Sequence, residues 1–165
     1  MKKLIFTLLF LMSTTAFSAP LSEDKYKVGE ARFKYLFWKV YDSSLFTKNK
    51  KFESLNQELT LSITYLRNIP KHRIVDATVN QWEHLNFDQK SISKWREKIE
   101  TILPEINKND NLSFHKQQTG IGSFYYNGKL IGEINDTQFS DAFLSIWLSS
   151  NTSEPKLRQK LISQK

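Results

Sequence analysis

The periodicity of the chain changes within residues 59–75, LTLSITYLRNIPKHRIV. Up to Tyr65, apolar and hydroxyl side chains alternate, which is the pattern of a β-strand with one buried face. Pro70 then interrupts the chain, and the apolar residues that follow have the spacing of a helix: Ile74, Val75, Val79 and Trp82. The sequence around Pro70 therefore predicts a domain that contains both strands and helices.

Further strands are predicted on both sides of this junction. Residues 26–41 are rich in aromatic and β-branched side chains, and the run becomes wholly apolar at Phe37-Trp38, which predicts a strand that enters a covered region. A short strand is expected at residues 112–114. Residues 123–134 are centred on Asn127-Gly128, the strongest short signal for a β-hairpin.

Helical spacing returns in two more segments. One contains Ile92, Trp95, Ile99 and Ile102 and is ended by Pro104, and the other contains Phe139, Ala142, Phe143, Ile146 and Trp147. Asp136 is placed to cap the second of these segments, and Pro155 suits the first turn of a last helix. The order of elements predicts an α+β fold in which helices cover one face of a large, mainly antiparallel sheet.

The N-terminus has the three parts of a secretory signal peptide. Lys2 and Lys3 precede an apolar run of nine residues, 4–12, and small residues follow up to Ala19. Nine residues rise only about 14 Å as a helix, which is too short to span a bilayer. We expect cleavage after Ser18, with cleavage after Ala19 or an uncleaved anchor as alternatives. This interpretation gives a signal peptide at 1–18, a single domain at 19–165, and a bacterial, periplasmic location.

Composition limits the class of protein further. The chain has 24 Lys and Arg against 17 Asp and Glu, a net charge of +7, and losing Lys2 and Lys3 lowers this to about +5. The excess positive charge is dispersed and no nucleic-acid motif accompanies it, so we expect a solvated surface and no nucleic-acid partner. The chain has no cysteine, so an exported domain must be stabilised by its core alone. No later run is long enough for a membrane span.

The sequence predicts no metal site, cofactor or nucleophilic centre. His72, His84 and His115 lie in different predicted elements, and His72 with Asp76 lacks a third metal ligand. No Gly-x-Ser-x-Gly motif is present. Gly120-Ile121-Gly122 precedes an aromatic strand instead of a helix, so it does not indicate a dinucleotide site.

A candidate ligand site is indicated by polar side chains that alternate with aromatic ones. Tyr65 and Arg67 continue the apolar face of the strand at 59–65, and Tyr41 and Arg32 lie in the first aromatic run. One interpretation is that this face simply reaches solvent where the strand ends. The other is that Arg67 lies at the rim of an apolar cleft, where a guanidinium and a phenol bind a carboxylate. The predicted ligand-binding residues are Arg67, Tyr65, Tyr41 and Arg32.

Five segments, in this order, resemble the bacterial chalcone isomerase-like proteins. They are VYDSSLF (40–46), LSITYLR (61–67), GEIND (132–136), FSDAFLSIWL (139–148) and TSEPKLR (152–158). The resemblance covers residues 26–162. It implies an open-faced β-sandwich of the chalcone isomerase type, in which a large antiparallel sheet packs against a layer of helices with a ligand cleft between them.

The superfamily that this resemblance implies includes plant enzymes that cyclise chalcones and relatives that bind fatty acids through an arginine and a tyrosine. Leu36 occupies the position of a plant catalytic threonine, and residues 70–73 contain no tyrosine where the plant enzymes have one. In the plant enzymes these groups would stabilise the enolate and position a water molecule. Because this chain lacks them, we do not expect it to be a catalyst.

Three hypotheses about function follow from the sequence. The first is an exported, non-catalytic protein that binds a small amphipathic ligand, such as a fatty acid, between sheet and helices. The second is an isomerase or lyase that acts on an unsaturated carbonyl compound. The third is an interaction module that binds another envelope protein through exposed aromatic residues and the basic C-terminal segment, 156–165.

Overall fold

The structure, a computed structural model, describes residues 25–163. The predicted signal peptide at 1–18 and its cleavage point lie outside the described residues. Among the described residues, no helix has both the length and the apolar character needed to cross a bilayer.

Six antiparallel strands form one sheet, in which each strand pairs with its neighbours in the sequence, in the order β1-β2-β3-β4-β5-β6. Their bounds are β1 Tyr26–Tyr35, β2 Trp38–Thr47, β3 Leu59–Tyr65, β4 Asn111–Lys116, β5 Gly122–Tyr126 and β6 Lys129–Ile134. The prediction of a large antiparallel sheet is confirmed.

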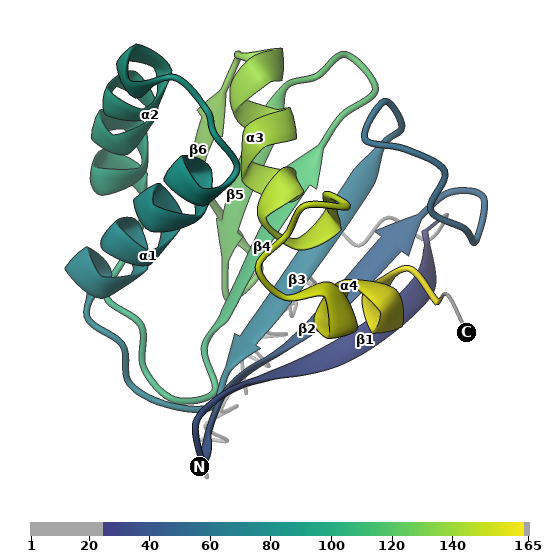
Figure 1. Cartoon of the computed structure of the whole chain (residues 1–165), viewed down its shortest axis with the longest axis horizontal. Coiled ribbons are helices and arrows are strands. Elements are labelled where there is room, and N and C mark those ends of the chain that lie inside the picture. Colours follow the sequence, from purple (N-terminus) through teal and green to yellow (C-terminus); the bar gives the residue numbers. More distant parts are fainter. Residues whose placement is uncertain (1–24, 164–165) are drawn as a thin grey trace, which may run out of the picture.

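Four helices lie across one face of this sheet (Figure 1). They are α1 Lys71–His84, α2 Gln89–Ile102, α3 Thr137–Leu148 and α4 Pro155–Leu161. The antiparallel pair α1–α2 is inserted between β3 and β4, which nevertheless pair with each other directly. The molecule therefore has two layers, as expected for the predicted α+β fold.

Strand β3 shows why the sheet has one covered face. Leu59, Leu61, Ile63 and Tyr65 are buried beneath the helices, whereas Ser62 and Thr64, on the other face, are partly exposed. This is the side-chain alternation that the sequence pattern predicted.

The core between the two layers combines aliphatic residues with a cluster of aromatic rings, and it contains no cysteine. Its rings contact one another edge to face or at a tilt, the arrangement that aromatic quadrupoles favour. Ring centroids are 5.4 Å apart in Trp82–Trp95, 4.7 Å in Phe114–Phe124 and 5.1 Å in Phe124–Phe143.

Local signals in the sequence correctly placed several element ends. Asn127 and Gly128 have φ values of 48° and 81°, as a tight turn between β5 and β6 requires. The Asp136 carboxylate accepts a hydrogen bond from the Phe139 N–H at 3.1 Å and caps α3. Pro155 occupies the first turn of α4.

The prediction for residues 26–41 was wrong in one respect. This run is two strands, β1 and β2, joined by a turn at Leu36-Phe37, and not a strand that enters a covered region. Phe37 is 96% exposed and Trp38 is 59% exposed. A wholly apolar run does not by itself separate a buried strand from an apolar turn, so the pattern was misleading.

Candidate functional site

A cavity of about 520 Å³ lies between the sheet and the helices. Its walls come from β1, β2, β3 and β4 on one side and mainly from α1 and α3 on the other. Its volume lies within the range typical of small-molecule sites. The lining residues are mostly apolar: Phe33, Tyr35, Val40, Tyr41, Ile63, Tyr65, Ile69, Arg73, Ile74, Ala77, Thr78, Gln81, Leu103, Leu112, Phe143, Ile146, Trp147, Ser153 and Glu154.

Strand register places three aromatic residues side by side on the cavity wall. Tyr41 of β2 is paired with Phe33 of β1 on one side and with Tyr65 of β3 on the other. The Phe33 and Tyr41 rings stack with centroids 5.1 Å apart, and Tyr41 meets Tyr65 edge to face at 6.0 Å. The structure thus brings together two of the four predicted site residues, Tyr41 and Tyr65.

The Tyr41 hydroxyl accepts a hydrogen bond from Trp147 Nε1 of α3 at 3.0 Å. Its own proton is not used in that contact, so the hydroxyl can still donate. Burial raises the pKa of Tyr41 to about 12, although the Trp147 hydrogen bond acts in the opposite direction. Tyr41 is therefore a neutral phenol at physiological pH.

The Tyr65 hydroxyl has no hydrogen-bond partner within residues 25–163. The side chain lines the cavity, and the residue is only 5% exposed. Burial raises the pKa of Tyr65 well above its ordinary value, and the neighbouring Tyr41 adds to the shift. The buried side-chain atoms without a partner within residues 25–163 are Thr47 Oγ1, Trp82 Nε1 and Ser140 Oγ; the Tyr65 oxygen is not one of them, because it opens onto the cavity. The cavity therefore contains a neutral donor that a ligand can satisfy.

The polar residues at the mouth of the cavity include one cation, Arg73, in the first turn of α1, and one carboxylate, Glu154, directly before α4. Ala77 and Gln81 follow on the same helical face and also line the cavity. The Arg73 side chain forms no hydrogen bond or ion pair with any residue that the structure describes. Sequence reasoning missed Arg73 as a site residue. A signal for it was present in the sequence. The helical spacing that begins at Ile74 predicts which face of the helix packs on the sheet, and Arg73 lies beside that face.

The other two predicted site residues lie outside the cavity lining. Arg67 is exposed beyond the end of β3, and its guanidinium lies 4.3 Å from the centroid of the Trp38 ring. Arg32 is on the uncovered face of β1, where its Nε and Nη2 atoms donate to the Asp42 carboxylate at 2.6 and 2.7 Å. Whether either arginine binds a ligand stays a prediction, but neither shares the cavity with the tyrosines.

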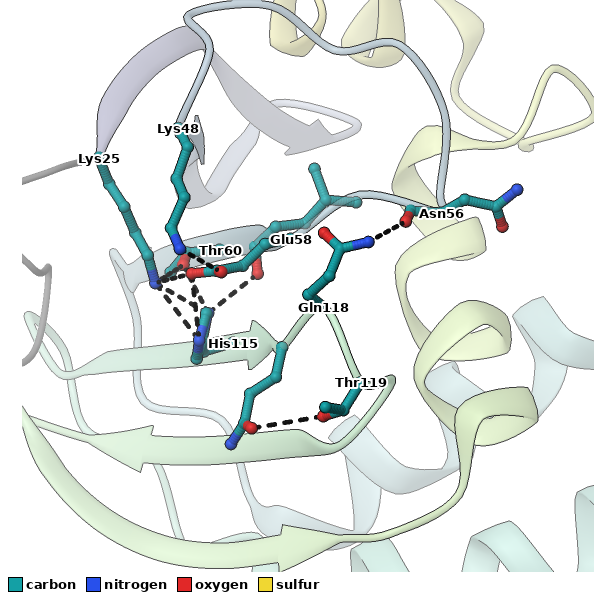
Figure 2. A network of polar contacts seen from close by, with 10 residues as sticks. Lys25, Lys48, Asn56, Glu58, Thr60, His115, Gln118 and Thr119 are labelled. Atoms are coloured by element: carbon teal, nitrogen blue, oxygen red, sulfur yellow. Dashed lines mark hydrogen bonds and ion pairs between the residues drawn. The ribbon is translucent and has the colours of Figure 1, made fainter.

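A second polar cluster, on the uncovered face of the sheet, surrounds Glu58 and His115 (Figure 2). Lys25 Nζ lies 3.3 Å from the Glu58 carboxylate and 2.9 Å from His115 Nδ1, and Lys48 Nζ lies 2.8 Å from Glu58. The Thr60 hydroxyl is 3.1 Å from His115 Nδ1. Burial, assisted by the charge of Lys25, lowers the pKa of His115. Because the partners are already present, this cluster is a structural contact that joins residue 25 to β3 and β4.

No group of three metal-ligating side chains occurs among residues 25–163. Of the positions that the resemblance matched to plant catalytic groups, Leu36 lies at the exposed turn, and within 70–73 only Arg73 lines the cavity.

Residues 28–163 match the family model described as chalcone isomerase-like. The protein therefore belongs to the chalcone isomerase-like family, as its motifs suggested.

Two further proteins are similar to this chain. An uncharacterized protein of Haemophilus influenzae is 24% identical over 156 residues, which cover 94% of this chain and 77% of the relative. The crystal structure of the fatty-acid binding protein AtFAP1 of Arabidopsis thaliana matches with a TM-score of 0.67, at 11% identity, over 88% of this chain and 90% of the other. At that identity the structural match shows a shared fold.

Proposed function

We propose that this protein binds a small amphipathic carboxylate, such as a fatty acid, in the cavity between sheet and helices. The observation that carries the proposal is the unpaired Tyr65 hydroxyl within an otherwise apolar cavity. Because this hydroxyl opens onto the cavity and has no partner within residues 25–163, a ligand in the cavity can accept its hydrogen bond.

The cavity offers different chemistry to the two ends of such a ligand. Its apolar walls accept a hydrocarbon chain, and each buried methylene contributes about 0.8 kcal/mol. For the head group, Tyr41 and Tyr65 supply neutral hydroxyl donors, and Arg73 supplies a positive charge at the mouth. Hydrogen bonds to an ionised acceptor are stronger than those between neutral groups, so this set favours a carboxylate over an alcohol or a hydrocarbon.

The structural neighbour AtFAP1 supports this choice of ligand, since it shares the fold and is itself a fatty-acid binding protein. The proposal for the present chain nevertheless depends on its own residues, because the two proteins are only 11% identical.

We expect binding without turnover. An isomerase that acts on an unsaturated carbonyl compound needs a group that accepts or donates a proton near neutral pH. Tyr41, with its pKa raised to about 12, is a weak acid, and its oxygen is occupied by Trp147. Loss of chalcone absorbance on incubation with the protein would instead support the alternative, an isomerase or lyase.

The decisive experiment measures binding of a fluorescent fatty acid to the wild type, Tyr65→Phe and Arg73→Gln. Removing one hydrogen bond to a carboxylate should weaken binding about tenfold or more in each variant. Arg32→Gln is the matched control, because it removes an arginine on the other face of the sheet and should leave affinity unchanged. Equal affinities for all four proteins, or no binding by the wild type, would contradict the proposal.

We also propose that the protein works in the bacterial periplasm. The support is the sequence pattern of residues 1–18. Fractionation of cells that express the full chain should place the protein in the periplasmic fraction, and N-terminal sequencing should begin at Ala19. Recovery of an unprocessed chain in the cytosol would overturn this proposal.

A further inference from the structure

The turn between β1 and β2 exposes four consecutive large apolar side chains. We call residues 35–38 the hairpin tip. Tyr35 is 65% exposed, Leu36 75%, Phe37 96% and Trp38 59%. Single exposed apolar residues are ordinary on a protein surface, but a contiguous group of this kind marks an interaction site.

Leu36 and Phe37, at the centre of the hairpin tip, are not part of the hydrophobic core. Leu36 has a φ of 52°, in the left-handed region that favours glycine or asparagine. A leucine there strains the backbone, and its side chain gains no burial in return. The two unfavourable features together suggest that the apolar side chains are used in contact with something outside the described residues.

Basic side chains surround the hairpin tip. Lys34 and Lys39 flank it on paired positions of β1 and β2, and both are exposed. Arg67 stacks on Trp38, with its guanidinium 4.3 Å from the ring centroid. Within residues 25–163, no carboxylate forms an ion pair with any of these three cations. Asp42, which pairs with Arg32, also lies close to Lys39. An apolar group flanked by Lys34, Lys39 and Arg67 complements a surface that is anionic outside and apolar beneath.

We propose that the hairpin tip docks onto an anionic lipid bilayer. Leu36 and Phe37 would enter the acyl region, while Trp38 and Tyr35 lie at the headgroup level where such rings concentrate. Lys34, Lys39 and Arg67 would contact anionic headgroups, each strengthening binding about fivefold near the surface. A second copy of the chain is a poorer partner, because joining two tips would bring their cations together.

The position of the hairpin tip connects it to the cavity. Phe33, Tyr35 and Val40 belong to the same hairpin and line the cavity. Figure 1 shows the β1–β2 turn at the end of the sheet where β3 ends and the chain leaves for α1. A docked tip would therefore hold the cavity mouth close to the lipid surface. A docked protein could then exchange a fatty acid between its cavity and the bilayer, which rests on the function proposed above. Docking itself does not depend on that function.

Binding is tested by flotation of the protein with phosphatidylglycerol-containing vesicles and with pure phosphatidylcholine vesicles. Of the four tryptophans, only Trp38 is exposed; Trp82 and Trp95 are buried and Trp147 is partly buried. Brominated lipid should therefore quench Trp38 emission selectively, and Trp38→Phe should abolish this quenching. We expect binding to the anionic vesicles that weakens as salt is added.

Two double variants test the apolar residues of the hairpin tip and the flanking lysines separately. Leu36→Asn with Phe37→Ser keeps a residue that tolerates positive φ and should lower the partition coefficient at least about tenfold. Lys34→Glu with Lys39→Glu should lower it about a hundredfold at low salt. The matched control is Leu130→Ser, which removes a 48%-exposed apolar side chain from β6 and should change nothing.

Equal vesicle binding by the wild type and the tip variants would overturn the proposal. The proposal would also be overturned if the tip proved necessary for a dimer in analytical ultracentrifugation, or for capture of a protein partner, while the wild type did not bind vesicles. Failure of the ligand proposal is distinguishable, because it would remove fatty-acid binding by the wild type and leave flotation and Trp38 quenching in place.

Discussion

The hydroxyl of Tyr65 has no hydrogen-bond partner among residues 25–163. Removing it should therefore affect ligand binding but not the stability of the protein. Tyr65→Phe should change the free energy of unfolding of the ligand-free protein by less than about 1 kcal/mol. The same variant should lose affinity for fatty acids. Urea unfolding and ligand titration on one preparation measure both quantities. A large loss of stability would mean that the hydroxyl has a structural role.

Leu36 permits a second test at the level of a single residue. Replacing it by asparagine, which tolerates a φ of 52°, should raise the free energy of unfolding by about 1 kcal/mol. Replacing it by valine, whose branched side chain disfavours positive φ, should lower it. Urea unfolding of both variants provides the comparison, and an equal response to both would contradict strain at this turn.

His115 should make stability depend on pH. Burial and then the charge of Lys25 lower the pKa of His115 in the folded protein, whereas in the unfolded chain this histidine titrates at about 6.5. Below that pH the unfolded state binds more protons, so the free energy of unfolding should fall as pH decreases from 6.5 toward the folded pKa. For Glu58, burial opposes ionisation, but hydrogen bonds from Lys48 and Lys25 outweigh it and lower the pKa. Its contribution is lost only in more acidic solution.

The measurement is thermal unfolding of the wild type and His115→Asn between about pH 7 and pH 5, on either side of the ordinary histidine pKa. The variant should show the flatter profile. His72→Asn, on the exposed surface of α1, is the matched control and should follow the wild type. Identical slopes for all three proteins would exclude His115 as the cause.

Among the elements, α4 depends on a glycine in β1. A Cβ atom added to Gly29 would lie 2.2 Å from the Lys160 carbonyl oxygen and 2.4 Å from that of Leu161. Both obstacles are backbone atoms, so the helix would have to move. Gly29→Ala should lower the free energy of unfolding by about 2 kcal/mol or more and accelerate hydrogen exchange in α4. Glu30→Ala, one residue further along the strand, is the control and should have little effect.

The sequence was informative about elements wherever a local rule decides the outcome. The alternation in β3, the turn at Asn127-Gly128 and the cap at Asp136 each depend on residues close together in the chain, and each was predicted. The end of β1 was not, because burial of Phe37 and Trp38 depends on where the chain turns and on what covers it.

The same distinction explains the candidate site. Tyr65 was selected because it continues the apolar face of the strand at 59–65, and Tyr41 because it lies in the first aromatic run. The pairing of β2 with β3 then brings them together. Arg67 follows the same alternation, but it lies beyond the last residue of β3 and turns to Trp38. Arg73 reaches the cavity from a different layer. No periodicity within a strand could have indicated this, because the packing of α1 on the sheet is tertiary.

For the whole molecule, the dependence of affinity on fatty-acid chain length should report the volume of the cavity. In a series of saturated fatty acids, affinity should rise about fourfold for each added methylene, which corresponds to about 0.8 kcal/mol. The rise should stop when the chain fills the volume of about 520 Å³. Calorimetric titration, or the thermal shift at fixed ligand concentration, measures the series. A flat series would indicate that the chain does not enter the cavity.

The open meander leaves two strands, β1 and β6, at the edges of the sheet. An unprotected edge is a template for pairing with another chain and so for aggregation. The pairing of β1 is irregular between Lys27 and Gly29, and the Ser163 hydroxyl donates to the Val28 carbonyl. Strand β6 has charged side chains, Lys129 and Glu133, at two of its three exposed positions, with Leu130 at the third. These features resist edge-to-edge growth, so the concentrated protein should avoid fibrous aggregation even though its uncovered sheet face and apolar tip meet solvent.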